Sequence, residues 1–141
     1  MKVPKPKKVK KISDWVLDDL VRKYIRLISG GYCKRCKKYI GTQIEVAHMY
    51  RRRRKTVRWD LRNVCGLCPD CHREIDNDAI KLTSFMYEVM TVEEVRELQR
   101  IANKTLKDYP IDREKIKREL KEKFKEVGCR GIKSVEFLWG K

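Results

Sequence analysis

Two Cys-x-x-Cys pairs lie near the only two histidines of the chain: His48 lies between the pairs and His72 directly follows the second. The first pair is Cys33 and Cys36, and the second is Cys68 and Cys71. Four thiolates at the corners of a tetrahedron are a ligand set that structural zinc prefers, and two such turns supply them. A thioredoxin-like redox pair would need a surrounding βαβ pattern, which this sequence lacks. We therefore predict that these four cysteines hold one structural zinc ion.

The sequence leaves one alternative to this ligand set open. Cys65 and Cys68 are also spaced as Cys-x-x-Cys, so this pair could replace Cys68 and Cys71. We favour Cys71 because His72 follows it directly, and Cys65 is then a small buried thiol. Four thiolates leave no open position for water, so the zinc is expected to be structural, and its loss should unfold so small a core. Cys129 has no partner motif.

The residues inside this frame resemble a nuclease family. His48, then Asn63, then LCPDCH ending at His72 are similar to the HNH nucleases with a ββα-metal site, and most similar to the phage NinG/Rap-like recombination nucleases. The resemblance runs from about residue 20 to 102 and includes Ala47-His48, RWDLRN and VEEVRELQRIA. Its most specific feature is the spacing of eight residues between Asn63 and His72.

This resemblance implies a metal-dependent DNA endonuclease that acts on branched or single-strand-containing DNA in phage-type recombination. His48 would be the general base, because a neutral imidazole near pH 7 can take a proton from water. It ends a predicted strand, and we expect it to face the helix that follows the second cysteine pair. A catalytic Mg²⁺ or Mn²⁺ would stabilise the phosphate and the leaving oxygen. His72 would bind this ion, and Asp76, four residues later on the same helical face, would be a second ligand. Asn63 would either orient His48 through its carbonyl or ligate the ion.

The sequence departs from this family at two positions. Many HNH enzymes carry Asp or His directly before the base, where this chain has Ala47, which cannot bind an ion; the NinG-like branch also tends to have a small residue there. That branch usually ends in Cys-Asn, whereas this chain has Cys71-His72. Glu45 or Asp60 could replace the missing carboxylate. Glu45 lies two residues before Ala47 and therefore on the same face of the predicted strand. The alternatives are a catalytically degenerate zinc-binding nucleic-acid-binding module and, more remotely, a protein-interaction adaptor.

The charge of the chain also indicates an anionic partner. Lys and Arg number 36 against 20 Asp and Glu, which gives a net charge of +16. Such an excess attracts nucleic acid over long distances. We expect phosphate contacts from a basic loop between His48 and Asn63, and nothing in it is suited to reading base edges, so recognition of DNA should depend on its structure. The predicted contact residues are Arg51, Arg52, Arg53, Arg54, Lys55 and Arg58.

Hydrophobic periodicity and capping residues predict an α+β fold. We expect a small zinc-stabilised ββα-metal (HNH/treble-clef-like) core with flanking N- and C-terminal helices. Three parts follow along the chain: a disordered basic tail over 1–12, a nuclease domain over 13–106, and a charged helical extension over 107–141. The predicted elements are helices over 13–29, 69–90, 91–106 and 112–127, strands over 44–48 and 57–61, and a strand or packed extension over 132–139.

The sequence also bears on the cellular location of the protein and on its oligomeric state. No apolar run approaches the roughly 20 residues of a membrane span, and the first residues lack the apolar core of a signal peptide. We therefore expect no membrane partner and a cytoplasmic location, in the host cell if the protein is viral, where thiols stay reduced. The apolar faces of 92–106 and 112–127 could form a homodimer or pack on their own domain.

Overall fold

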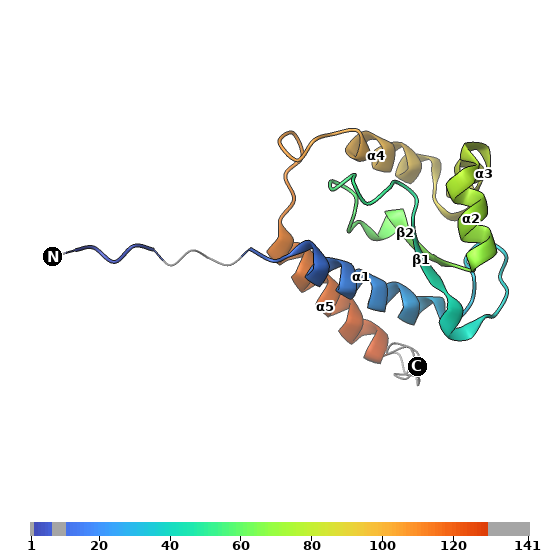
Figure 1. The fold of residues 1–141 in the computed structure, drawn as a ribbon, viewed down its shortest axis with the longest axis horizontal. Helices are drawn as coiled ribbons and strands as arrows, with labels where there is room; N and C mark the ends of the chain where they lie inside the picture. The colour runs from blue at the N-terminus through green and yellow to red at the C-terminus, as the bar shows by residue number, and fades with distance from the viewer. Residues whose placement is uncertain (1, 7–10, 130–141) are drawn as a thin grey trace.

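The computed structural model describes residues 2–6 and 11–129 (Figure 1). The described chain is α+β, with five α-helices and one antiparallel sheet of two strands. The predicted extension over 132–139 and the side chain of Cys129 lie outside the described residues, as does part of the predicted tail. The elements are α1 Asp14–Ser29, β1 Glu45–His48, β2 Val64–Leu67, α2 Pro69–Asn77, α3 Ala79–Val89, α4 Val92–Ala102 and α5 Arg113–Cys129.

Helix α1 confirms the helix predicted over 13–29. The Ser13 hydroxyl accepts a hydrogen bond from the backbone N–H of Val16 and caps the first turn. Gly30 ends the helix in the left-handed region at φ 58°, where a residue without Cβ is favoured. Its apolar stripe, which includes Leu17 and Val21, is buried against the rest of the protein.

The sheet is a hairpin in which β1 confirms the first predicted strand. Ala47 pairs with Cys65 and His48 pairs with Val64. The second strand predicted over 57–61 is wrong, because that segment is turn and the strand follows at 64–67. The carboxylate of Asp60 accepts from the backbone N–H of Arg62 and holds a single 3-10 turn there. This local hydrogen bond outweighs the strand propensity of the apolar residues around it.

The helix predicted over 69–90 is divided in two. Asp78 interrupts it, and its side chain accepts hydrogen bonds from the backbone N–H groups of Ile80 and Lys81, which begins α3. The capping box predicted from Thr91 and Glu94 is confirmed at the start of α4. Helix α4 ends at Ala102, four residues before the predicted end.

Helix α5 packs along α1 (Figure 1). Leu120 is buried in a cluster with Leu17 and Val21, and the rings of Tyr24 and Phe124 meet edge to face with centroids 5.7 Å apart. The charged segment over 112–127 therefore covers its own domain with its apolar face. No helix within the described residues is both long enough and apolar enough to cross a membrane.

Candidate functional site

The four predicted zinc ligands lie together. The sulfur atoms of Cys33, Cys36, Cys68 and Cys71 are all within 4.8 Å of one another. The Cys36 and Cys68 sulfurs are 3.8 Å apart, and a tetrahedron built on zinc–sulfur bonds of about 2.3 Å has edges of roughly 3.8 Å. These four cysteines could therefore hold a metal ion such as zinc. Cys36 is exposed, and the other three are buried.

The alternative ligand Cys65 is not part of this group. It lies on β2 opposite Ala47, with its thiol buried. Burial raises the pKa of this thiol to about 12, so it stays protonated at neutral pH. Cys65 is a core residue, and the choice of Cys68 with Cys71 agrees with the geometry.

The backbone around Cys33 prepares this cluster for a cation. Burial raises the pKa of the Cys33 thiol, but backbone N–H groups directed at its sulfur outweigh burial and bring this pKa to about 6, whereas burial raises the pKa values of Cys68 and Cys71. The loop is fixed by two hydrogen bonds, from Cys33 N–H to the Lys38 carbonyl and from Lys34 N–H to the Gly66 carbonyl, both at 2.9 Å. The second bond ties the loop to β2. A thiolate is the form of Cys that binds metal, so this arrangement favours ligation.

His48 is held at the end of β1 by a backbone carbonyl. Its Nε2 lies 3.1 Å from the carbonyl oxygen of Arg58. A carbonyl can only accept, so Nε2 carries the proton and Nδ1 keeps its lone pair. Burial lowers the pKa of His48 from its ordinary value of 6.5, which keeps the ring neutral at pH 7. A half-buried, neutral imidazole in a fixed tautomer has the properties of a general base.

His48 opens into a groove between β1 and α1. The groove has a volume of about 290 Å³ and is lined by Trp15, Asp18, Arg22 and Arg52 as well as the histidine. The expectation that His48 faces the helix after the second cysteine pair is wrong. Side chains alternate along a strand. Thus His48 shares the α1 side with Val46, whereas Ala47 is buried in the cluster that includes Ile75 of α2.

His72 has two carboxylate neighbours. Its Nδ1 is 3.4 Å from Oε1 of Glu45, and its Nε2 is 3.4 Å from Oδ2 of Asp76. Asp76 thus lies beside His72, as the spacing of four residues predicts, and Glu45 reaches it from β1. The two carboxylates approach opposite nitrogens and do not converge on one point. Within the described residues, the cysteine cluster is the only such convergent group of three or more His, Cys, Asp or Glu.

Asn63 closes the loop that follows His48. It is fully buried, and its Oδ1 accepts from the backbone N–H of Tyr50 at 2.7 Å. Its Nδ2 donates to the carbonyls of Tyr50 and Val57, each at 3.1 Å. The side chain therefore holds the loop that carries the Arg58 carbonyl, and its effect on His48 is indirect. The direct roles expected for Asn63, as partner of His48 or ligand of an ion, are not what this geometry provides.

The predicted phosphate-binding residues fall into two groups. Arg51 and Arg53 are exposed, and in the described part of the chain their side chains have no hydrogen bond or ion pair. These two are free to contact phosphate. The other members of the loop are engaged: Arg52 with Asp18 at 2.7 Å, Lys55 with Asp14 at 3.2 Å, and Arg54 with the carbonyl of Ala102 at 3.2 Å.

Arg58 is structural and not a free cation. Its side chain is only 12 % exposed and pairs with Asp18 at 2.6 Å, and its guanidinium lies 5.4 Å from the centre of the Trp59 ring. Burial raises the pKa of Asp18, but hydrogen bonds from Arg58, Trp59 and Arg52 outweigh it and hold that pKa at about 2. Sequence reasoning missed Asp18 and its neighbour Asp14, because α1 is charged on many positions and nothing marks these two.

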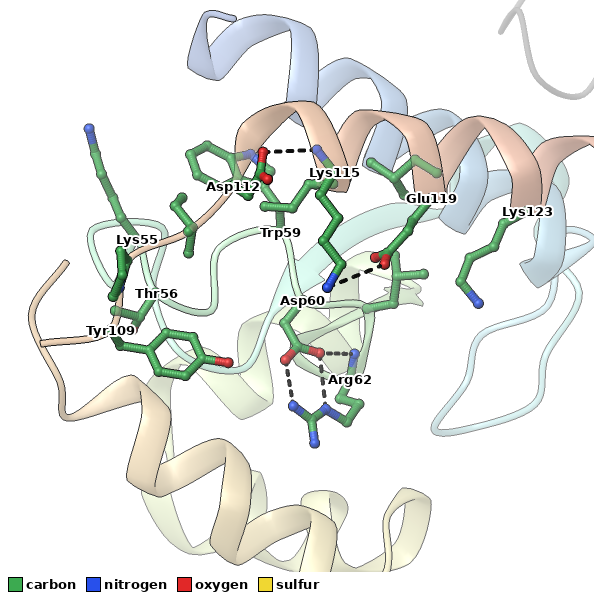
Figure 2. A pocket seen from close by; sticks show the side chains of 15 residues that line it. Lys55, Thr56, Trp59, Asp60, Arg62, Tyr109, Asp112, Lys115, Glu119 and Lys123 are labelled. Carbon is green, nitrogen blue, oxygen red and sulfur yellow. Dashed lines mark hydrogen bonds and ion pairs between the residues drawn. The ribbon is translucent and has the colours of Figure 1, made fainter.

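Asp60, considered above as a replacement carboxylate, lines a different cavity. This cavity has a volume of about 480 Å³ and lies between the loop around Trp59 and α5. Figure 2 shows the side chains that line it, with Asp60 joined to Arg62. Two bonds link their side chains, at 2.7 and 3.1 Å. Lys115 and Glu119 form a second, looser pair at 4.0 Å along the opposite wall. Asp60 is already paired with Arg62 and lines this separate cavity, so it is not an ion ligand beside His72.

Comparisons with models of known protein families, with curated proteins and with solved structures find no match. The chemistry of the chain's own residues therefore has to carry the functional conclusion.

Proposed function

We propose that this protein is a metal-dependent DNA endonuclease of the HNH type, with structural zinc in the cysteine cluster. One observation carries the proposal. The Arg58 carbonyl accepts a hydrogen bond from Nε2–H of His48, which leaves the lone pair of Nδ1 as a base. This base lies in a groove lined by Arg22 and Arg52, each paired with an aspartate of α1 (Asp19 and Asp18), on a strongly basic chain. Hydrolysis of a phosphodiester needs this combination of a base for water and cations for the phosphate.

The roles of the residues follow from their positions. Nδ1 of His48 accepts the proton of the attacking water, while Arg22 and Arg52 hold the phosphate in exchange for their present partners, Asp19 and Asp18. Arg51 and Arg53 contact neighbouring phosphates, because their side chains are exposed and unpaired within the described residues. Since these contacts reach the backbone and not the bases, the substrate is recognised by its structure. The resemblance to NinG-like nucleases extends this to branched or single-strand-containing DNA in phage-type recombination.

A catalytic Mg²⁺ or Mn²⁺ would be held by His72, Asp76 and Glu45. This set of one imidazole and two carboxylates fits such an ion by its chemistry. Both carboxylates are accessible, with side chains 41 % and 56 % exposed, so they can turn toward one side of the imidazole ring. When bound, the ion would supply stabilisation of negative charge on the phosphate and the leaving oxygen.

The second candidate is a nucleic-acid-binding module without catalysis. The separation of the two histidines favours it. His48 opens toward α1, while Glu45 and His72 meet at the far end of β1, and three steps along a strand span roughly 10 Å. Ala47, where many HNH enzymes bind the ion, is fully buried.

The deciding experiment is cleavage of labelled branched, duplex and single-stranded DNA with Mg²⁺ or Mn²⁺. We expect His48→Ala to lower the rate by about 10²- to 10⁴-fold, the usual contribution of a general base, while DNA binding is retained. His72→Ala is the matched control. It should weaken the ion's affinity, so that higher Mg²⁺ restores its activity, whereas no ion concentration restores His48→Ala.

The pH dependence gives a second check on the same residue. Because burial lowers the pKa of His48, the base is neutral above that pKa and protonated below it. The rate should be level around pH 7 and fall below a pKa that lies under 6.5. If the wild type cuts no DNA with either ion, yet binds it in a salt-sensitive manner, the binding module is the correct function. Binding whose affinity does not change with salt concentration would support the protein-interaction adaptor.

A further inference from the structure

A second groove borders the other strand of the sheet. It has a volume of about 450 Å³, and its lining includes apolar residues of α1 and β2, among them Ile25, Ile28 and Val64. Tyr32 and Lys34 also line it, and both belong to the loop over residues 30–44, here called the cysteine loop, which carries the first cysteine pair. The groove of His48 touches β1, whereas this one touches β2. It plays no part in the hydrolysis described above.

Two tyrosines of the cysteine loop expose their rings beside this groove. Tyr32 and Tyr39 are 56 % and 64 % exposed, with ring centroids 5.1 Å apart and planes tilted by 58°. Contact with each other covers only part of each ring. The remaining surfaces are flat aromatic faces in solvent, which are suited to stacking on another planar ring.

The tyrosines are held on a rigid base. The backbone N–H of Tyr32 donates to the Ser29 carbonyl at 3.0 Å, and the backbones of Tyr32 and Tyr39 pair in a β-bridge. The same loop is tied to β2 through the Lys34–Gly66 hydrogen bond. Its cysteines would be fixed further by the proposed zinc. A ligand that stacks here would therefore lose little free energy in ordering the protein.

The sequence around the two tyrosines carries positive charges and no acidic residue that would neutralise them. Residues 30–44 contain four lysines and arginines and no aspartate or glutamate. Arg35 pairs with Glu74 of α2, and the Lys37 ammonium donates to the Lys34 carbonyl. The side chains of Lys34 and Lys38 have no hydrogen bond or ion pair in the described chain. These two are available for phosphates next to a stacked base.

We propose that this groove and its tyrosines bind an unpaired nucleobase of a DNA strand, with Lys34 and Lys38 on the flanking phosphates. Paired bases hide their faces inside the duplex, so an apolar groove beside exposed rings selects bases that are not paired. The proposal rests on the proposed function and specifies its substrate as DNA with a single-stranded segment. The two grooves border different strands of the same sheet, so one branched DNA could reach both.

The test measures DNA binding without Mg²⁺ or Mn²⁺, so that no strand is cut. The probes are a single-stranded oligonucleotide that carries 2-aminopurine and a blunt duplex of the same sequence. We expect Tyr32→Ala to bind the single strand about ten-fold more weakly, as for the loss of one base stack, and to bind the duplex as the wild type does. Quenching of 2-aminopurine should be lost with Tyr32→Ala and retained with Tyr32→Phe.

The control is Tyr87→Ala, which removes an exposed tyrosine of α3 and should leave both affinities unchanged. Zinc content is measured for every variant to verify that the cysteine loop is intact. The proposal is overturned if Tyr32→Ala binds the single strand normally, or if it loses the single strand and the duplex equally. Because binding is measured apart from cutting, inactivity of the wild type would refute the nuclease and leave this result standing.

Discussion

The two histidines of this protein lie in regions that are held together by different forces. His72 follows the cysteine cluster, where four sulfurs converge and the neighbouring core is apolar. His48 lies beside a network of charges in which two aspartates of α1 bind residues from two other parts of the chain, the loop after β1 and α5. The pairs of this network, here called the aspartate clamp, are Asp14 with Lys55, Arg58 and Arg113, and Asp18 with Arg52, Arg58 and the Trp59 indole N–H.

Because of this difference, the two regions should respond differently to mutation and to a change of pH. A metal site forms as a whole, because each missing ligand weakens all the others, and it demands deprotonated ligands. The aspartate clamp is distributed over several ion pairs of moderate strength. Loss of one pair should loosen the loop that positions His48 without unfolding the protein.

Removal of one cysteine ligand should abolish the fold. Cys36 is exposed, so Cys36→Ser costs almost no packing and tests ligation alone. Zinc binding to such sites contributes about 10–16 kcal/mol, which exceeds the total stability of most small domains. We expect loss of bound zinc and of the cooperative thermal transition, measured by metal analysis and circular dichroism.

The control for this variant is Cys65→Ala. Cys65 is buried outside the cluster, so its replacement should keep one zinc per chain and cost only about 1 kcal/mol of stability. A folded Cys36→Ser protein that still binds zinc would mean that the four sulfurs do not form the site.

Replacement of Asn63 should destabilise the region of His48 and leave the cysteine region intact. Asn63→Ala leaves the N–H and carbonyl of Tyr50 without their partner, and the carbonyl of Val57 keeps only its hydrogen bond from the backbone N–H of Asp60. We expect the free energy of unfolding to fall by about 2–4 kcal/mol, because buried backbone groups without hydrogen-bond partners are costly. Urea unfolding would measure it, with zinc content unchanged at one per chain.

Asn77→Ala is the matched control, because Asn77 is exposed and makes one hydrogen bond to the Arg73 carbonyl. It should cost less than about 0.5 kcal/mol. Equal stabilities of the two variants would show that Asn63 does not hold the loop.

The parts of the fold that could be predicted are those fixed by neighbours in sequence. Ser13 and Gly30 mark the two ends of α1, Thr91 caps the start of α4, and two short cysteine turns supply the four sulfurs that could hold a metal ion. Each depends on hydrogen bonds or ligands that span only three or four residues. The wrong strand at 57–61 and the break at Asp78 share one cause. There, a polar side chain bonds the nearby backbone and overrides the apolar pattern.

The orientation of His48 could not be predicted in the same way. Strand alternation places Ala47 and His48 on opposite faces, but it does not say which helix covers which face. That choice depends on α1 and on contacts between distant residues, such as Asp14 with Arg113 and Asp18 with Arg58. Ion pairs across such separations leave no spacing pattern in a sequence. The candidate site was therefore predicted by residue type, and its arrangement was not.

Lowering the pH should affect the cysteine region before the aspartate clamp. The pKa of Asp18 is held at about 2, below its ordinary value of 3.8, so its stabilisation is complete above 3.8 and is lost only as the pH falls toward 2. This shift corresponds to about 2 kcal/mol. Asp18→Asn should cost that amount equally at pH 5.5 and pH 8, by urea unfolding, while zinc affinity falls at the lower pH because thiols protonate.

Asp70→Asn is the control for this measurement. Asp70 pairs with Arg73 on the surface with its side chain 83 % exposed, so the change should cost less than about 0.5 kcal/mol. If the cost of Asp18→Asn changes by more than 1 kcal/mol between the two pH values, another titrating group controls the clamp.

The smallest effects should distinguish the arginines of the basic loop. Arg51 is free of ion pairs in the described residues, whereas Arg52 already pairs with Asp18. Each phosphate contact to duplex DNA contributes about 0.9 to the slope of log affinity against log salt. Arg51→Ala should lower the slope by about that amount and leave stability unchanged. Arg52→Ala should lower the slope less, because Asp18 competes with phosphate for its guanidinium. Equal slopes for the two variants would mean that Arg52 leaves Asp18 when DNA binds, which would make the clamp a part of the DNA-binding surface.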